Sequence, residues 1–339
     1  MTRHLAIVGP TASGKSAVAL AVAHALGDVE IVSLDSMQVY RGLDIGTAKP
    51  TVAERNAVRH HLVDVADPAE DWSVRATQDA ARAAITDIEA RGRRALLVGG
   101  TGLYVRAVVD GLNVPPRDLV VRAALERETA TISGLARAYE RLAVADPPAV
   151  TRIEPGNARR IVRALEVIEI TGLPFSSFGA GLTEYGPPAI DVGLVGVWLP
   201  RAELGRRIDA RFAAMRDAGL ETEVRALAAR RPSPPALAPG SDESLEESSR
   251  RGGGLSRTAA QAIGYKEILA HLDGEVPSLS DAFDLAVHRT RQFARRQRMW
   301  FRRDPRIRWV GTARNPDDLA AVVVALWDAK AATVVADCA

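Results

Sequence analysis

Residues 9–16, with the sequence GPTASGKS, constrain the fold of this chain more than any other stretch. They follow a short apolar run that begins at Leu5, match G-x-x-x-x-G-K-[ST] at every fixed position, and precede an alanine-rich helical pattern. A strand, a glycine loop and a helix start are the context in which this motif holds phosphates. The glycines let successive N–H groups converge, and the helix N-terminus adds a partial positive charge. A tight turn with a chance lysine is the alternative interpretation.

The motif predicts a site for a di- or triphosphate. Lys15 supplies a full positive charge, and the Ser16 hydroxyl is a ligand for Mg²⁺, the one cofactor that the sequence indicates. The predicted phosphate-binding residues are Gly9, Pro10, Thr11, Ala12, Ser13, Gly14, Lys15 and Ser16.

Further short apolar runs at 30–34, 94–98 and 191–198 read as strands, and helical patterns separate them. The first two end in polar or glycine-rich loops. This alternation is typical of a parallel, doubly wound α/β sheet. We therefore predict an α/β fold: a P-loop NTPase-like parallel sheet flanked by helices, with a helical insertion domain and a helical C-terminal region.

The same patterns suggest domain boundaries. The first part of the core spans 1–116, a helical insertion 117–188, and the second part of the core 189–230. Residues 231–257 have low complexity and too few apolar side chains to fold, so we expect a disordered loop. Basic helices and a last core strand at 258–312 precede a C-terminal helix and tail at 313–339. Long single helices are expected over 117–142 and 201–230.

Composition narrows the class of protein. No apolar run approaches the ~20 residues that a membrane span needs, so we expect no membrane partner. The single cysteine, Cys338, leaves no disulfide within the chain, which favours a cytoplasmic protein, and we expect a monomer. Of the 44 basic residues only four are lysines, so Lys15, Lys49 and Lys266 mark places where a compact ammonium is required.

Asp35 is the most informative carboxylate, because it follows the second strand, which an ordinary parallel arrangement places beside the phosphate loop. It could be a general base, an indirect partner of Mg²⁺, or a loop-forming aspartate. The strand at 95–98 ends in Gly-Gly-Thr-Gly without the acid that P-loop NTPases normally carry there. Thr101 offers a neutral hydroxyl instead. The pattern suits a diphosphate ester that is attacked at carbon, with pyrophosphate leaving.

Nine arginines fall between 289 and 308, interleaved with Phe293, Trp300 and Phe301. Such density indicates contacts with a nucleic-acid backbone. A second group at 152–163 could serve the same purpose or pair with the local acids Glu154 and Glu166.

Seven segments, in order along nearly the whole chain, resemble the bacterial tRNA dimethylallyltransferases (tRNA isopentenyltransferases). They are GPTASGKS (9–16), SLDSMQVYRGLDIGTAKP (33–50), LLVGGTGLY (96–104), RRIVRALEV (159–167), RIDARFAAM (207–215), TAAQAIGYKE (258–267) and TRQFARRQRMWFR (290–302). The resemblance implies transfer of a dimethylallyl group from dimethylallyl diphosphate to N6 of an adenine beside the anticodon of tRNA, with release of diphosphate. The adenine would have to leave its stack.

The resemblance also implies roles for particular residues. Asp35 would take the proton from N6, while Lys15, Thr101 and Arg211 would stabilise charge on the leaving diphosphate. The implied contacts with tRNA come from Asp35, Ser36, Met37, Gln38, Thr101, Arg122, Arg159, Arg160, Ile161, Val162, Arg163, Gly264, Tyr265 and Lys266. The rival interpretations are a P-loop small-molecule kinase and a non-catalytic RNA-binding NTPase. The missing acid counts against the first, and the second leaves Asp35 and Thr101 without a task.

Overall fold

The computed structural model describes residues 2–179, 184–230, 254–311 and 315–328. The chain divides into two compact units, one formed by Met1–Val109 with Pro188–Ala339 and the other by Asp110–Pro187. No helix within the described ranges is long and apolar enough to cross a membrane.

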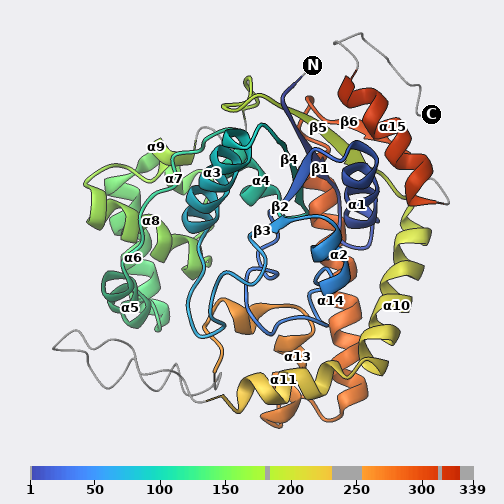
Figure 1. Ribbon diagram of the computed structural model, residues 1–339. Helices are drawn as coiled ribbons and strands as arrows, with labels where there is room; N and C mark the ends of the chain where they lie inside the picture. The colour runs from blue at the N-terminus through green and yellow to red at the C-terminus, as the bar shows by residue number, and fades with distance from the viewer. Residues whose placement is uncertain (1, 180–183, 231–253, 312–314, 329–339) are drawn as a thin grey trace. The chain divides into compact units, whose positions relative to one another are not determined.

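The larger unit is built on one six-stranded sheet (Figure 1). Its strands are β1 (His4–Val8), β2 (Val29–Ser33), β3 (His60–His61), β4 (Arg94–Gly99), β5 (Val192–Val197) and β6 (Arg308–Val310). They lie in the order β3-β2-β4-β1-β5-β6, and all neighbours are parallel. The predicted α/β class and parallel sheet are confirmed.

Both faces of this sheet are buried, as parallel sheets require. On one face, Leu5 and Ile7 of β1 pack with α1 (Lys15–Leu26) and α15 (Pro316–Asp328). On the other, Ala6 and Val8 pack with α3 (Val74–Ala90) and α4 (Gly102–Val109). Alternate residues of one apolar strand thus serve two helical layers, which explains why the strands read as continuous apolar runs.

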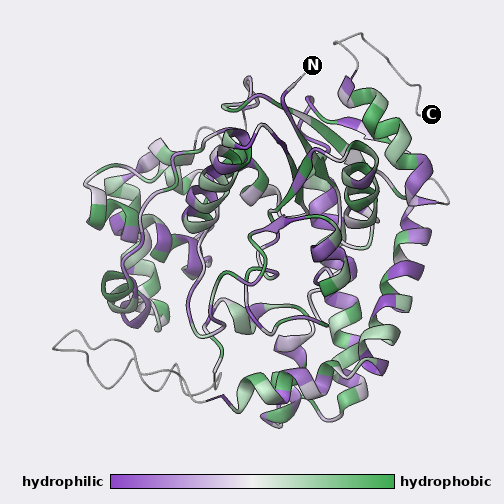
Figure 2. Ribbon diagram, in the orientation of Figure 1, coloured by the Kyte–Doolittle hydropathy of each residue, from purple (hydrophilic) through white to green (hydrophobic). Residues whose placement is uncertain are grey.

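A second core of the same unit lies beyond the carboxyl ends of the strands. It includes α10 (Arg201–Asp217), α11 (Leu220–Ala228), the 3₁₀ turn Ala259–Gln261, α13 (Tyr265–Leu272) and α14 (Leu279–Phe301). Figure 2 shows hydrophilic and hydrophobic residues alternating along α10. The predicted single helix over 201–230 is wrong, because Gly219 adopts a left-handed φ of 90° and separates α10 from α11.

The segment predicted as a disordered loop, 231–257, falls largely on 231–253, which lie outside the described residues. Its last part is ordered, which corrects that prediction. Leu255 is buried in the second core, and the Ser256 N–H donates to the Pro68 carbonyl at 2.6 Å. One apolar side chain in a polar stretch is enough to anchor it.

The smaller unit is helical. It contains α5 (Leu119–Glu128), α6 (Ile132–Ala145), α7 (Pro147–Val150), α8 (Ala158–Thr171) and α9 (Ser176–Gly179) around a core that includes Leu142, Ile161 and Leu165. The helix predicted over 117–142 is two helices, because the Thr131 hydroxyl accepts from the Gly134 N–H and starts a new helix. This unit spans 110–187, whereas the predicted insertion spans 117–188.

Candidate active site

The loop between β1 and α1 presents a set of open hydrogen-bond donors. Gly14 takes a φ of 89° and turns the chain into α1, so that the N–H groups of Gly14, Lys15 and Ser16 donate no hydrogen bond within the described part of the chain. The hydroxyl of Ser13 is buried and also lacks a partner there. Unpaired buried polar groups are costly. A converging set of them at a helix N-terminus is the arrangement that binds an anion.

Lys15 lies at the first residue of α1, and its ammonium makes no ion pair with any described residue. Desolvation lowers the pKa of Lys15 to about 8, while the Asp35 carboxylate opposes this shift and the Arg211 guanidinium adds to it. A bound anion would restore the charge that desolvation disfavours. The lysine is therefore prepared for a negatively charged ligand.

Arg211 reaches the same loop from α10. Its Nη1 donates to the Thr11 hydroxyl at 3.2 Å. Burial lowers the pKa of Arg211 from its ordinary value, with Asp35 acting in the opposite direction. Two cations and one carboxylate therefore interact at this loop, although they come from residues 15, 35 and 211 of the chain.

Asp35 follows β2, but β2 is not the neighbour of β1. The sequence predicted that the Asp35 strand lies next to the strand of the phosphate loop, and this strand order is wrong because β4 pairs with both β1 and β2. The Asp35 charge still acts on the pKa values of Lys15 and Arg211 at that loop. Asp35 Oδ1 accepts the N–H groups of Met37 at 2.9 Å and Gln38 at 3.3 Å. Asp35 Oδ2 has no hydrogen-bond partner among the described residues. One oxygen therefore shapes the loop, and the other is available to accept a proton.

Thr101 follows β4, between the strands that carry the phosphate loop and Asp35. Its carbonyl accepts the N–H groups of Tyr104 and Val105 at the start of α4. Its hydroxyl has no partner among the residues that the structure describes. The turn after β4 carries no Asp or Glu, so this strand end offers no carboxylate to hold a metal ion beside the phosphate loop.

Gln38 is braced by its own loop. Its Oε1 accepts from the Ser33 hydroxyl at 3.1 Å, and its Nε2 donates to the carbonyls of Thr47 and Ala48, each at 3.2 Å. Ser36 and Met37 are partly exposed beside it. The amide of Gln38 is thus held in one orientation, with one acceptor lone pair of Oε1 left for another partner.

Lys49 stabilises the loop that follows. Its ammonium contacts Asp44 and Asp64, each at 2.6 Å, and donates to the Tyr40 carbonyl at 2.7 Å. The side chain is only 3% exposed. A compact ammonium is indeed used here, but it is satisfied within the protein. Of the lysines that the sequence singled out, Lys15 and Lys266 make no ion pair with a described residue, and Lys15 is the one at the phosphate loop.

Tyr265 departs from its predicted role in binding tRNA directly. Its side chain is fully buried, and its hydroxyl donates to Glu223. Glu223 in turn accepts N–H groups from the loop at 44–46, at 2.8 Å from Ile45. Burial and the Glu223 charge raise the pKa of Tyr265. Its neighbour Lys266 is exposed and can meet RNA.

The residues predicted to bind RNA in the helical unit fall into three groups. Ile161 and Val162 belong to its core, so their side chains do not face a ligand. Arg122 and Arg163 both contact the buried carboxylate of Glu166, at 3.4 and 2.8 Å. The other two arginines, Arg159 and Arg160, are exposed at the start of α8.

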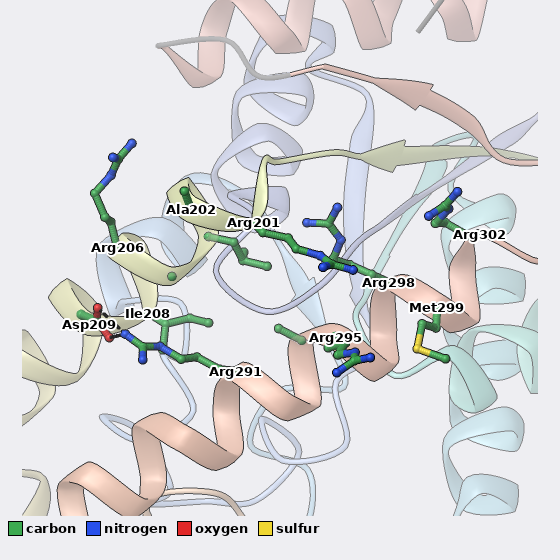
Figure 3. A pocket seen from close by; sticks show the side chains of 13 residues that line it. Arg201, Ala202, Arg206, Ile208, Asp209, Arg291, Arg295, Arg298, Met299 and Arg302 are labelled. Carbon is green, nitrogen blue, oxygen red and sulfur yellow. Dashed lines mark hydrogen bonds and ion pairs between the residues drawn. The ribbon is translucent and has the colours of Figure 1, made fainter. Parts of the chain in front are cut away.

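A cavity of about 610 Å³ lies between α10 and α14. Its arginines are Arg201, Arg206, Arg291, Arg295, Arg298 and Arg302 (Figure 3). Arg291 pairs with Asp209 at 2.7 Å, and Arg206 pairs with Glu203. Arg201, Arg295 and Arg302 have no carboxylate partner within the described ranges.

The uncompensated charge in this cavity is visible at Arg298. Its guanidinium lies 4.0 Å from the Trp198 ring centroid and donates to the Leu199 carbonyl. Desolvation, together with Arg201 and Arg302, lowers the pKa of Arg298. Arginines that outnumber the acids beside them and repel one another form an anion-binding surface.

Ser16 is the residue at the phosphate loop whose oxygen the sequence predicted as a ligand for Mg²⁺. No three His, Cys, Asp or Glu side chains gather as a metal site in the part of the chain that the structure describes. Ser16 is exposed at the start of α1, with its hydroxyl free of protein partners in that part. Mg²⁺ commonly takes one or two protein oxygens, substrate phosphates and water. The Ser16 hydroxyl fits an ion that arrives with a diphosphate.

Two residues of the site had no role assigned from sequence. Gln297 lies in the quoted segment 290–302, where the arginines drew attention, yet its amide joins Thr11 to Gly100. Glu223 lies in α11 outside every quoted segment, and it holds the loop at 44–46. A neutral amide among arginines was a possible signal for Gln297. Nothing in the local sequence marks Glu223.

The sheet order and the phosphate loop after β1, with its converging N–H groups, define a protein of the P-loop class with an anion-binding site. Comparison with known proteins identifies its family. The family model for IPP transferase matches residues 38–304. The tRNA dimethylallyltransferase of Salinispora arenicola is 50% identical over 309 residues, which cover 91% of this chain and 82% of that protein. That of Kineococcus radiotolerans is 47% identical over 331 residues, 95% of each.

Solved structures agree. The tRNA isopentenylpyrophosphate transferase from Bacillus halodurans has a TM-score of 0.63 and 35% identity, and the match covers 96% of both chains. A eukaryotic dimethylallyltransferase acting on tRNA has a TM-score of 0.70 and 25% identity, over 98% of this chain and 77% of that one. The chain belongs to the tRNA dimethylallyltransferase (IPP transferase) family, and it is a transferase. The predicted family is confirmed.

Proposed function

We propose that this protein transfers the dimethylallyl group of dimethylallyl diphosphate to N6 of an adenine next to the anticodon of tRNA and releases diphosphate. Membership of the family supports the reaction. The observation that supports the assignment of residues is the presence of polar groups without partners at two strand ends. Among the described residues, the phosphate loop has donors without a partner, and Asp35 Oδ2 on the far side of β4 has none either.

The diphosphate binds the N–H groups of Gly14, Lys15 and Ser16 in this proposal. The Lys15 ammonium and the Arg211 guanidinium neutralise it, and the Thr101 hydroxyl donates to one of its oxygens. The Ser16 hydroxyl would hold Mg²⁺, which would supply further positive charge to offset the negative charge of the leaving group. These groups stabilise the charge that grows as the carbon–oxygen bond breaks, and such preorganised contacts commonly dominate catalysis.

Adenine N6 is a weak nucleophile, because its lone pair is delocalised into the ring. Asp35 Oδ2 accepts the N6 proton as the new nitrogen–carbon bond forms. Oδ1 stays bonded to the N–H groups of Met37 and Gln38, which keeps the carboxylate in place. The Gln38 amide, fixed by its three protein partners, lies beside the base and is proposed to contact its edge.

Exposed cations bind the RNA. In the helical unit these are Arg159 and Arg160, and in the larger unit they are Lys266 and the cavity arginines Arg201, Arg295 and Arg302, since none of them is neutralised by a carboxylate among the described residues. Arg122 and Arg163 act through Glu166 and position the helical unit's own elements. A monomer in the cytoplasm completes the proposal, and size-exclusion chromatography with light scattering tests the oligomeric part.

One assay tests the reaction against its main rival. Purified protein, Mg²⁺, dimethylallyl diphosphate with a labelled allyl group and unmodified tRNA are incubated without ATP. The label should move to RNA whose anticodon loop has an adenine at the modified position, and not to RNA that carries guanine there. Absence of transfer to the adenine-containing RNA contradicts the proposal. Conversion of ATP to ADP with a small-molecule acceptor would support a kinase.

A further inference from the structure

Gln297 joins the two loops that flank the proposed diphosphate site. It lies near the end of α14, far from both loops in sequence, and it is buried. Its Oε1 accepts the Thr11 N–H at 2.8 Å, and its Nε2 donates to the Gly100 carbonyl at 2.7 Å. Thr11 belongs to the phosphate loop, and Gly100 precedes Thr101. A single side chain therefore sets the spacing between the phosphate loop and the turn after β4.

The chemistry of this bridge requires an amide. The Thr11 N–H can only donate and the Gly100 carbonyl can only accept, which fixes the orientation of the amide. A carboxylate would accept from Thr11 but repel the carbonyl, and a cation would do the reverse. Glutamine provides both functions without adding charge beside a diphosphate.

The space around Gly100 shows how tightly the loops meet. A Cβ atom built on Gly100 would lie 2.8 Å from Gln297 Nε2, 3.2 Å from the Gly9 carbonyl oxygen and 3.3 Å from Lys15 Nζ. Only glycine allows the turn after β4 to approach both ends of the phosphate loop. Gln297 occupies the point of closest approach.

The next turn of α14 holds the other side of Thr101. A Cβ on Gly102 would lie 2.0 Å from Trp300 Cδ1, so the Trp300 indole packs directly on Gly102. Residues 297 and 300 are three apart and face the same side of a helix. Gln297 fixes the residue before Thr101, and Trp300 covers the residue after it. The Thr101 hydroxyl, which has no protein partner in the described chain, is thus aimed by its neighbours.

From this arrangement we infer that Gln297 is a positioning residue for the transfer reaction, which holds the Thr101 hydroxyl at a fixed distance from the phosphate loop. The inference rests on the proposed function, because it concerns the transition state of that reaction. It assigns Gln297 no contact with substrate. Loss of the bridge lets the Thr101 turn move relative to the phosphate loop, and a displacement of about 1 Å can cost roughly 10²-fold in rate.

The test is a double-mutant cycle measured as kcat with saturating donor and tRNA. Gln297→Met keeps the length of the side chain and removes both hydrogen bonds, and Thr101→Val removes the hydroxyl and keeps the shape. Each single variant should lower kcat, by roughly 10- to 100-fold for Gln297→Met, while the KM for tRNA changes little. If Gln297 acts through the hydroxyl, the double variant should be no slower than the slower single variant, within about threefold.

Gln78→Met is the matched control. Gln78 is a buried glutamine of α3 whose Nε2 donates to the Ala107 carbonyl at 2.6 Å, so this change also removes a buried amide bond. It should lower the melting temperature without a matching loss of kcat. Gln297→Asn, whose shorter side chain holds only one of the two loops, replaces Gln297→Met if the latter does not fold.

Losses that multiply in the double variant overturn the inference, and so does an unchanged kcat in Thr101→Val. Equal loss of kcat in Gln78→Met would show that any destabilisation of this unit reduces the rate, and would also overturn it. Wild-type protein is assayed first. Absence of transfer by the wild type would refute the proposed function itself, which is a different result from an active wild type with an additive cycle.

Discussion

Raising the pH above about 8 should weaken binding of the diphosphate donor, because Lys15 loses its proton in that range. Desolvation lowers its pKa in the free protein, and the negative charge of a bound diphosphate raises it again. The ligand therefore prefers the protonated form. Its affinity is fully present well below pH 8 and falls as the pH rises through the pKa of the free protein.

The size of the loss in affinity follows from the pKa of about 8 for Lys15. About half of the free protein carries a protonated Lys15 at pH 8, and roughly one-tenth does so at pH 9. As long as the complex stays protonated, the dissociation constant rises toward about tenfold per pH unit, or about 1.4 kcal/mol of binding free energy. Arg211 stays charged throughout, so part of the affinity survives.

Isothermal titration calorimetry with dimethylallyl diphosphate and Mg²⁺, from pH 7 to 9.5, measures this dependence directly. Lys15→Gln is the control. It removes the titrating group, whereas any effect of pH on the ligand itself or on Mg²⁺ remains. The dissociation constant of Lys15→Gln divided by that of the wild type should be constant below pH 7.5 and should fall above pH 8. A ratio that stays constant across the whole range would refute the assignment of Lys15 as the group that titrates.

Three further substitutions test other parts of the site. Asp35→Ala should lower kcat by roughly 10²–10⁴-fold with tRNA affinity nearly unchanged, and an equal loss of affinity in a filter-binding assay would make Asp35 a base-recognition residue. Tyr265→Phe should lower the free energy of unfolding by about 1–2 kcal/mol in urea denaturation, whereas weaker tRNA binding at unchanged stability would restore its predicted RNA contact. Arg295→Ala should reduce the slope of log affinity for tRNA against log salt by about 0.7–0.9, and Arg206→Ala, already paired with a glutamate, should not.

Local patterns were sufficient to predict the elements that local physics determines. The phosphate loop, its strand and its helix were predicted from the twenty-one consecutive residues 5–25, because glycine conformation and helix-terminus charge act within that stretch. A local contact also starts α3, because the Ser73 hydroxyl accepts the Ala76 N–H and caps that helix. The family was predicted for a similar reason, since each of its motifs is one continuous stretch of sequence.

Features that depend on distant pairing were beyond the sequence. Nothing in the strand at 94–99 states that it lies between β1 and β2, because all three strands are equally apolar and buried on both faces. Tyr265 was assigned to RNA because it lies in a family motif, while its burial depends on Glu223 and on the close approach of Gly46. A motif indicates that a residue has a role, but the burial of that residue in the fold determines whether the role is in structure or in binding.

The strand order, which could not be read from the sequence, sets the distance between Asp35 and the phosphate loop. Neighbouring strands lie about 4.8 Å apart, so the interposed β4 separates the ends of β1 and β2 by roughly 10 Å. Displacement at carbon needs the nucleophile and the leaving oxygen on opposite sides of that carbon. A base directly beside the phosphate loop would leave no room for the allyl group and N6. In the proposed reaction, with β4 between them, the phosphate loop holds the diphosphate at one end and Asp35 meets the adenine at the other. Thr101, at the end of β4, lies between the two.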